Sequence, residues 1–367
     1  MKTRLAVVNL GCEKNLVDTE NMVGILQDAD FEIIQDLSEA ELIIINTCSF
    51  IKEAKEEAID RIIELGGYKE TGKCQGLIVA GCLAQRYGPQ LVAEMPEIDA
   101  LIGTGSFHRI KEVCSDLIGN MTMSKGKQKL IHLEAPDKIF SPLFLRFNSG
   151  PPHRAYVKIA EGCDNRCSYC LIPTFRGSLK SRPLEEIVTE VRGLTQLGVK
   201  EINLIAQNVN QYGFDNPGGP GIVDLLRRLV SVNGIKWVRL LYLYPADIST
   251  ELLEFMNREE KMCRYLDIPF QHCHDRILKA MNRRGQRIFL EELITRIRER
   301  VPGISLRSTF IVGFPGETEA EFEDLLGFIS KVRFDNLGAF KYSREEGTPA
   351  AELQGQVSEK VKTQRLN

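Results

Sequence analysis

The chain has 367 residues, enough for two or three domains that each bury a core of their own. Its composition, 43% hydrophobic and 26% charged, is that of an ordinary globular protein, and it contains no run of about 18 apolar residues that could span a membrane. The N-terminal apolar run Lys2–Leu10 is too short for a signal peptide, so a cytoplasmic location is expected. The net charge of −3 argues against a basic surface that would attract nucleic acid along the whole protein.

The first 118 residues alternate strand-like and helix-like segments. Short apolar runs predict strands at Leu5–Leu10, Leu42–Ile45, Leu77–Ala80 and Ala100–Ile102. Segments with helical spacing lie between them, for example Val17–Leu26 and Ala54–Leu65. This alternation predicts an α/β domain over residues 1–118, a doubly wound parallel sheet with helices on both faces. Residues 119–150 show no sustained period and are predicted to be a connector.

The alternation restarts after residue 150 and predicts a second domain over residues 151–350. Six strands are predicted at Ala155–Ala160, Ile202–Ala206, Val238–Leu243, Tyr265–Pro269, Ser305–Val312 and Leu337–Tyr342. Amphipathic segments between them include Leu184–Leu197, Val223–Leu229, Arg287–Arg300 and Glu319–Val332. Six such βα units predict an incomplete TIM-like (βα)6 barrel, with its site at the carboxyl ends of the strands. Residues 351–367 begin a further helical pattern and are predicted to start a C-terminal linker helix.

Cysteine usage is the most informative chemical feature, because ten cysteines in a cytosolic chain favour metal or redox chemistry over disulfides. Cys163, Cys167 and Cys170 follow the first barrel strand with the spacing C-x3-C-x2-C. Soft thiolate ligands suit an iron–sulfur cluster or zinc. Three ligands would leave one iron of a four-iron cluster open to a substrate or cofactor. A zinc site completed by a distant His or Cys is the alternative at this point.

A second set of cysteines is dispersed in the sequence but equivalent in position. Cys12, Cys48 and Cys82 each follow one of the first three predicted strands. Because the carboxyl ends of parallel strands share one edge of a sheet, the three thiols are expected to converge there. Buried cysteines that only pack at strand ends are the alternative. The remaining cysteines, Cys74, Cys114, Cys263 and Cys273, are expected to pack without a chemical role.

The barrel motif resembles the radical-SAM superfamily, because Tyr169 places an aromatic residue directly before the last cysteine of C-x3-C-x2-C. The resemblance implies that S-adenosylmethionine (SAM) binds the open iron and is cleaved by one electron to a 5′-deoxyadenosyl radical, with Cys163, Cys167 and Cys170 as the catalytic ligands. It also implies SAM contacts from polar residues and a Gly-rich turn at the strand ends: Gln207, Asn208, Gln271, Gly313 and Gly316, beside Tyr169. The neighbouring basic residues Arg283, Arg284 and Arg287 are expected to form a solvated face.

Five segments together resemble the radical-SAM methylthiotransferases, over nearly the whole chain. They are Gly11–Glu20, Asn46–Ile51, Gly81–Tyr87, Lys158–Asp164 and Ala339–Thr348. The resemblance implies a second [4Fe-4S] cluster on Cys12, Cys48 and Cys82, which carries the sulfur. It favours the branch that methylthiolates the β-carbon of an aspartate in small-subunit ribosomal protein S12, with a low-potential electron donor such as flavodoxin or ferredoxin as partner.

The chain departs from this family pattern in two places, one of which bears on the identity of the substrate. The segment Gln207–Gly213 is closer to the sister branch, which modifies a tRNA adenosine, so tRNA is the alternative substrate. The small C-terminal β-barrel of the family, the TRAM domain, is expected to be absent, since residues 351–367 only begin the linker helix. A non-catalytic zinc-binding scaffold is the competing reading from another class.

Overall fold

The structure is a computed structural model that describes all residues except 1, 28, 30, 123–128 and 137–145. The chain divides into two compact units. Residues 1–152 together with 172–180 form the first unit, and residues 153–171 together with 181–367 form the second.

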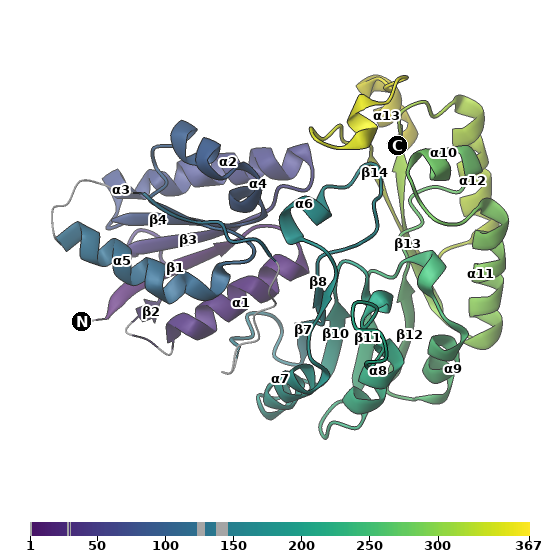
Figure 1. Cartoon of the computed structure of the whole chain (residues 1–367), viewed down its shortest axis with the longest axis horizontal. Helices are drawn as coiled ribbons and strands as arrows, with labels where there is room; N and C mark the ends of the chain where they lie inside the picture. Colours follow the sequence, from purple (N-terminus) through teal and green to yellow (C-terminus); the bar gives the residue numbers. More distant parts are fainter. Residues whose placement is uncertain (1, 28, 30, 123–128, 137–145) are drawn as a thin grey trace. The chain divides into compact units, whose positions relative to one another are not determined.

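The first unit is built on a six-stranded, fully parallel sheet with the strand order β2-β1-β3-β4-β5-β6 (Figure 1). The strands are β1 (Thr3–Asn9), β2 (Phe31–Ile33), β3 (Leu42–Thr47), β4 (Gly76–Gly81), β5 (Ala100–Ile102) and β6 (Leu130–His132). The predicted parallel sheet is confirmed, and the two edge strands β2 and β6 were not predicted. Each has three residues, too few to show a period. β6 lies inside the segment 119–150, whose residues 123–128 and 137–145 are outside the described part of the chain.

Helices cover both faces of this sheet, because its central strands are apolar on both sides. On one face, α1 (Glu13–Gln27) and α5 (Ile110–Thr122) pack on a core that includes Leu42 and Ile44 of β3. On the other face, α2 (Lys52–Gly66) and α4 (Cys82–Glu94) pack on Ile43 and Ile45. The short helices are α3 (Tyr68–Thr71) and α6 (Ile172–Arg176), the latter inserted from the middle of the sequence.

The second unit contains a six-stranded parallel sheet whose order, β14-β13-β12-β11-β10-β7, leaves β7 and β14 as edges (Figure 1). The predicted incomplete barrel is therefore confirmed. Its strands are β7 (Arg154–Lys158), β10 (Glu201–Ile205), β11 (Trp237–Leu240), β12 (Met262–Asp267), β13 (Ser305–Val312) and β14 (Asn336–Lys341). Two short strands, β8 (Ala160–Glu161) and β9 (Lys180–Ser181), lie outside this sheet.

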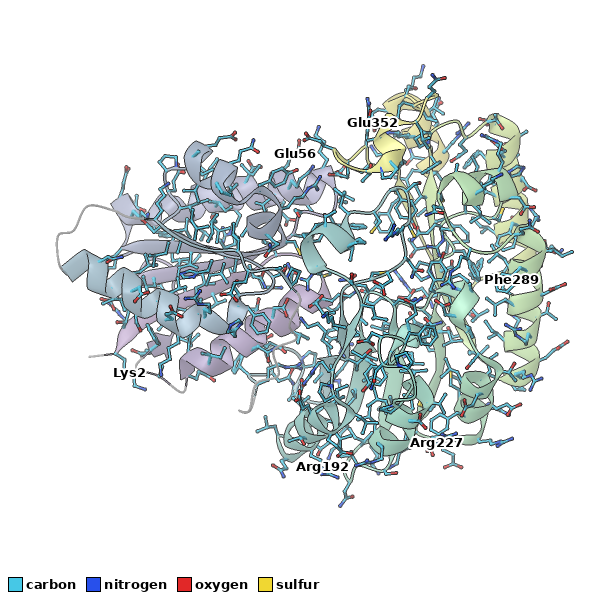
Figure 2. The ribbon with its side chains drawn as sticks, in the orientation of Figure 1. Lys2, Glu56, Arg192, Arg227, Phe289 and Glu352 are labelled. Carbon is cyan, nitrogen blue, oxygen red and sulfur yellow. The ribbon has the colours of Figure 1, made fainter. Side chains whose placement is uncertain are left out.

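Helices alternate with the barrel strands along the chain. They are α7 (Leu184–Gln196), α8 (Ile222–Val230), α9 (Thr250–Arg258), α10 (Asp275–Ala280), α11 (Arg287–Arg300), α12 (Glu319–Val332) and α13 (Glu359–Leu366). Their outer faces are polar: Arg192 of α7 and Arg227 of α8 point away from the sheet (Figure 2). Within the described residues, no helix is both long and apolar enough to cross a membrane.

The face of the barrel sheet opposite its helices is polar rather than filled by apolar side chains. Strand β13 alternates strictly, with buried residues such as Phe310 between half-buried ones such as Arg307. Arg307 pairs with Asp267 at 2.8 Å, and Arg239 pairs with Glu201 at 2.9 Å. A closed TIM barrel fills this space with layers of branched apolar residues. The open sheet instead presents hydrogen-bonding groups that a polar ligand could meet.

The last residues of the predicted connector are tied to α1 by a buried ion pair. The carboxylate of Glu20 lies 3.0 Å from Nε of Arg146, and both side chains are at most 3% exposed. The same carboxylate accepts hydrogen bonds from the backbone N–H and the hydroxyl of Ser149, at 2.8 and 2.7 Å. Removing one member of such a buried pair leaves the other charge buried without compensation.

We predict that Glu20→Ala destabilises the first unit by about 3–5 kcal/mol. Amide hydrogen exchange in β1 and β3 measures this change, as lost protection of the central strands. The matched control is Glu112→Ala, which removes the exposed ion pair between Glu112 of α5 and Arg109 in the same unit and should leave the protection of β1 and β3 nearly unchanged. Equal protection in the two variants would contradict the stabilising role of Glu20.

Candidate iron–sulfur and cofactor site

Three strand ends of the first unit carry the N-terminal cysteines. Cys48 and Cys82 directly follow β3 and β4, and Cys12 comes shortly after β1. The strand register places Asn9 beside Asn46 and Thr47 beside Gly81, so the three strands end at one edge of the sheet. The three thiols interact: the pKa of Cys82 is raised by both Cys48 and Cys12, in addition to the larger effect of burial. The predicted convergence is therefore present in the geometry.

Two glycines allow the chain to turn sharply at this edge. Gly11 and Gly81 have φ angles of +112° and +93°, which side-chain-bearing residues rarely adopt. A Cβ atom on Gly81 would collide with the side-chain oxygen of Asn46 and stand 2.7 Å from the carbonyl oxygen of Thr47. A Cβ atom on Gly11 would stand 3.0 Å from Cβ of Cys48. Glycine is thus required for the close packing of the three cysteine-bearing loops.

Asn15, on the first turn of α1, is fully buried between the loops. Its Nδ2 donates to the carbonyl oxygens of Thr47 and Leu10 at 2.9 and 3.3 Å, which fixes the orientation of the amide. Its Oδ1 therefore faces the thiols and lies 3.6 Å from Sγ of Cys82 and 4.0 Å from Sγ of Cys12. Asn15 thus holds two of the three cysteine loops together.

Burial sets the protonation of these thiols in the metal-free protein. Burial raises the pKa of Cys82 to about 12 and also raises that of Cys48. Arg176 acts in the opposite direction on both pKa values, since its positive charge favours the thiolate. Metal ions bind cysteine as the thiolate, so a metal would have to displace these protons.

Arg176 reaches this site from α6, six residues after Cys170. Its side chain is 1% exposed, and its Nη2 donates to Oδ1 of Asn15 at 2.6 Å. It also lies 3.4 Å from the carboxylate of Asp18 on α1. This placement could not be predicted from the sequence, because a single arginine in a short segment has no period or motif.

The barrel cysteines lie in the loop that follows β7 and β8 in the second unit. Cys167 is buried, whereas Cys163 and Cys170 are half-buried. Burial raises the pKa of the Cys163 thiol, and the nearby Cys167 raises this pKa further. Just before the loop, Nζ of Lys158 lies 2.6 Å from a carboxylate oxygen of Glu161, in a buried pair.

Hydrogen bonds fasten the cysteine loop to the end of α10. The hydroxyl and the N–H of Ser168 donate to the carbonyl oxygens of Ala280 and Met281, at 2.7 and 2.9 Å. Nδ2 of Asn282 donates to the carbonyl oxygen of Arg166 at 2.6 Å. The loop is therefore held in place by the protein before any cluster binds.

Arg283 extends this support to Cys167, contrary to the expectation that it belongs to a solvated face. Its Nη1 donates to the Tyr169 hydroxyl at 3.2 Å and approaches Sγ of Cys167 at 3.7 Å. Its guanidinium also stacks on the ring of Tyr244, 4.5 Å from the centroid. Its Nη2 donates to the carbonyl oxygen of Pro269 at 2.6 Å. This bond and the stacking on the aromatic ring replace the hydration that the guanidinium would have in solvent. Arg284 is exposed, as expected.

The predicted polar SAM contacts differ in their surroundings. Nδ2 of Asn208 donates to Asp247 at 3.1 Å, and its Oδ1 accepts from the N–H of Tyr244, so this amide is engaged in the fold. Gln207 is half-buried after the end of β10. Gln271 has its backbone bonded to β13, whereas its buried Oε1 has no hydrogen-bond partner among the described residues. Such an orphaned acceptor fits a ligand that brings a donor, such as an ammonium group.

The Gly-rich turn after β13 packs against the C-terminal segment of the chain. The space beside Gly313, where φ is +72°, is filled by the side chain of Lys362 on α13. The N–H of Gly316 donates to the carbonyl oxygen of Gly355 at 2.7 Å. Contacts within the chain are therefore enough to explain both glycines. Their predicted contact with SAM stays a prediction.

Both sets of thiols fit an iron–sulfur cluster by their chemistry. Each offers three soft sulfur ligands at the carboxyl ends of parallel strands, and three ligands leave one iron of a four-iron cluster open. Within the described part of the chain, no three His, Cys, Asp or Glu side chains stand close enough to hold a single metal ion. Ligands of a cluster bind different irons and need not meet at one point.

Two family models match the chain, one over each set of thiols. The model described as "Uncharacterized protein family UPF0004" matches residues 4–103, and that of the "Radical SAM superfamily" matches residues 157–329. The first range includes Cys12, Cys48 and Cys82, and the second includes Cys163, Cys167 and Cys170.

Solved structures share the fold at low sequence identity. The radical S-adenosylmethionine methyltransferase TsrM from Kitasatospora setae, with cobalamin and a [4Fe-4S] cluster bound, aligns with a TM-score of 0.68 at 15% identity, over 95% of this chain and 77% of that chain. The cobalamin-dependent S-adenosylmethionine radical enzyme OxsB aligns with a TM-score of 0.61 at 14% identity, over 100% of this chain and 55% of that chain. These likenesses concern the fold.

Curated relatives are much closer in sequence. The ribosomal protein uS12 methylthiotransferase RimO of Geobacter sulfurreducens is 50% identical over 99% of this chain and 80% of its own length. The protein of the same name from Pelotomaculum thermopropionicum is 49% identical over 100% of this chain and 81% of its own length. With this identity over both sets of thiols, the chain belongs to the RimO family of radical-SAM methylthiotransferases.

Proposed function

We propose that this chain transfers a methylthio group to the β-carbon of an aspartate in ribosomal protein uS12. The observation that carries the proposal is the pair of cysteine triads, one at the carboxyl ends of three strands of the first sheet and the other in the loop after the first strand of the barrel sheet. A relative at 50% identity is named as a ribosomal protein uS12 methylthiotransferase, and this name supports uS12 as the substrate.

The residues that would hold the cofactors follow from this placement. Cys163, Cys167 and Cys170 would hold one [4Fe-4S] cluster, and the N-terminal triad of Cys12, Cys48 and Cys82 would hold a second. When bound, the two clusters and SAM would supply a 5′-deoxyadenosyl radical and a methylthio group. Gln271, with its orphaned buried Oε1, supports a SAM contact at the end of the barrel sheet.

Radical chemistry is what the substrate requires. The β-carbon of an aspartate bears C–H bonds that are not acidic enough for a side-chain base near neutral pH. The protein's own part is to orient the reactants and exclude water. Arg283 and Tyr169 brace the loop around Cys167, and the polar inner face around Arg239 and Arg307 offers hydrogen bonds to a polar substrate.

The remaining partners follow from the chemistry. Reductive cleavage of SAM needs one electron at low potential, so we propose a donor such as flavodoxin or ferredoxin. A ribosomal-protein substrate places the reaction in the cytoplasm.

A tRNA adenosine is the second candidate substrate, because the segment Gln207–Gly213 resembles the tRNA-modifying branch. The side chains of this segment are engaged within the fold: Asn208 and Gln211 donate to Asp247 at 3.1 and 2.9 Å, and Asn210 donates to the carbonyl oxygen of Tyr244 at 3.0 Å. A packing role for these residues explains the local resemblance without a change of substrate, so uS12 remains the first candidate.

Replacing any one of Cys12, Cys48 and Cys82 by Ala should abolish methylthio transfer and leave SAM cleavage intact, because the barrel cysteines are untouched. Mass spectrometry of the substrate measures the first activity, and formation of 5′-deoxyadenosine measures the second. Cys114→Ala is the matched control, since Cys114 is a buried thiol of the same unit that lies on α5, away from the strand ends. Full transfer activity in all three variants would refute the second cluster.

Substrate choice is predicted to favour protein over RNA. Reconstituted protein incubated in parallel with uS12 and with unmodified tRNA should add a mass of one methylthio group to an aspartate-containing peptide of uS12 only. Modification of the tRNA, with uS12 unchanged, would assign the chain to the other branch.

A further inference from the structure

Arg176 is a cationic neighbour of the N-terminal triad that is almost fully buried. Arg176 is 1% exposed and sits at the end of a five-residue helix, α6, in a segment that belongs to the first unit although it follows the barrel cysteines in sequence. An arginine buried this deeply is costly unless its charge meets partners of the opposite sign. One of its partners is the carboxylate of Asp18, which is 3.4 Å away, long for a charge-assisted bond.

The segment that carries Arg176 is firmly anchored in the first unit. The hydroxyl of Thr104 donates to the carbonyl oxygen of Phe175 at 2.6 Å, and the Phe175 side chain is 2% exposed. Gly177 follows with a φ of +74°, which ends the helix, and a Cβ there would stand 3.1 Å from the carbonyl oxygen of Pro136. The guanidinium is thus delivered to a fixed position.

The short contact of Arg176 is to the residue that organises the thiols. Its Nη2 donates to Oδ1 of Asn15 at 2.6 Å, the same oxygen that lies 3.6 Å from Sγ of Cys82. In the metal-free protein, that oxygen can accept the thiol proton of Cys82. A thiolate bound to iron has no proton to donate, so the oxygen then depends on Arg176 as its donor.

Arg176 also brings its positive charge close to the sulfur atoms. The Asn15 oxygen that its Nη2 contacts at 2.6 Å lies 3.6 Å from Sγ of Cys82. Hydrogen bonds to ligand sulfurs and nearby charge are two of the factors that set the reduction potential of an iron–sulfur cluster. A buried cation stabilises the reduced form of a cluster, which is the more negative one, and so raises its reduction potential.

We propose that Arg176 is a positioning residue of the N-terminal cluster, which holds Asn15 against the cysteine ligands and raises the reduction potential of the group bound to Cys12, Cys48 and Cys82. This inference rests on the proposed function, because it requires that triad to bind a cluster.

The test uses the full chain with Cys163, Cys167 and Cys170 replaced by Ala, so that only the N-terminal cluster is present. In this background, Arg176→Gln removes the charge, and Arg176→Lys keeps the charge but loses the planar fork. Arg146→Gln is the matched control, an arginine of the same unit that is equally buried but paired with Glu20. The readouts are the midpoint potential from a redox titration followed by electron paramagnetic resonance, and the rate of iron loss to a chelator.

Arg176→Gln should shift the midpoint potential to a more negative value, because the positive charge is removed. It should also speed iron loss by about 10- to 100-fold, because residues that hydrogen-bond around a metal site contribute that much to metal affinity. Arg176→Lys should keep a potential near that of the background protein but lose iron faster, and Arg146→Gln should leave the potential unchanged. An unchanged potential in Arg176→Gln, or an equal shift in Arg146→Gln, overturns the role of Arg176. If Arg176→Gln does not fold, Arg176→Lys decides: iron loss as slow as in the background protein overturns the inference. If the background protein itself binds no iron, the proposed function fails, and the inference fails with it.

Discussion

Parallel strand direction is the constraint on which the whole arrangement depends. A fully parallel sheet gathers the carboxyl ends of its strands at one edge, so residues far apart in sequence meet there without any local motif. Cys12, Cys48 and Cys82 come together for this reason, although up to 35 residues lie between consecutive members of the set. The barrel sheet follows the same rule and presents its cysteine loop, Gln271 and the turn after β13 at strand ends. Reversing a single strand in either sheet would dismantle its site.

Burial at these edges has an electrostatic cost that local polar groups offset. Burial raises the pKa of the Cys82 thiol to about 12, so the site disfavours the thiolate form that metals need. Arg176 counters this in the first unit, because its positive charge favours the thiolate and lowers the pKa of Cys82. In the second unit, Arg283 lies beside Cys167, with its Nη1 3.7 Å from Sγ. Each arginine comes from a segment outside the cysteine motif that it supports. Sequence motifs therefore identify the candidate cysteines, whereas the charged side chains beside them come from the tertiary fold.

The elements with a clear period were predictable, and the supporting contacts were not. Helices α11 and α12 were predicted with the bounds that they have, since each combines a helical period with a polar outer face, and α12 has a capping box at Thr318. The three-residue edge strands β2 and β6 were not predicted, because they are too short to show alternation. Arg283 was expected in solvent, because one-dimensional charge patterning cannot reveal the ring of Tyr244 on which it stacks. The positions of the six cysteines were placed correctly at strand ends, while their role as cluster ligands is the proposal that experiment must test.

Metal analysis tests the central claim, two independent clusters on two cysteine triads, most directly. Iron and acid-labile sulfide should be measured in anaerobically reconstituted wild type, in the Cys163/Cys167/Cys170→Ala variant and in the Cys12/Cys48/Cys82→Ala variant. Two four-iron clusters predict about eight iron and eight sulfide per wild-type chain, and about four of each in either variant. Complete loss of iron from the Cys163/Cys167/Cys170→Ala variant would leave the barrel cluster as the only one, and zinc without sulfide in the wild type would contradict the account altogether.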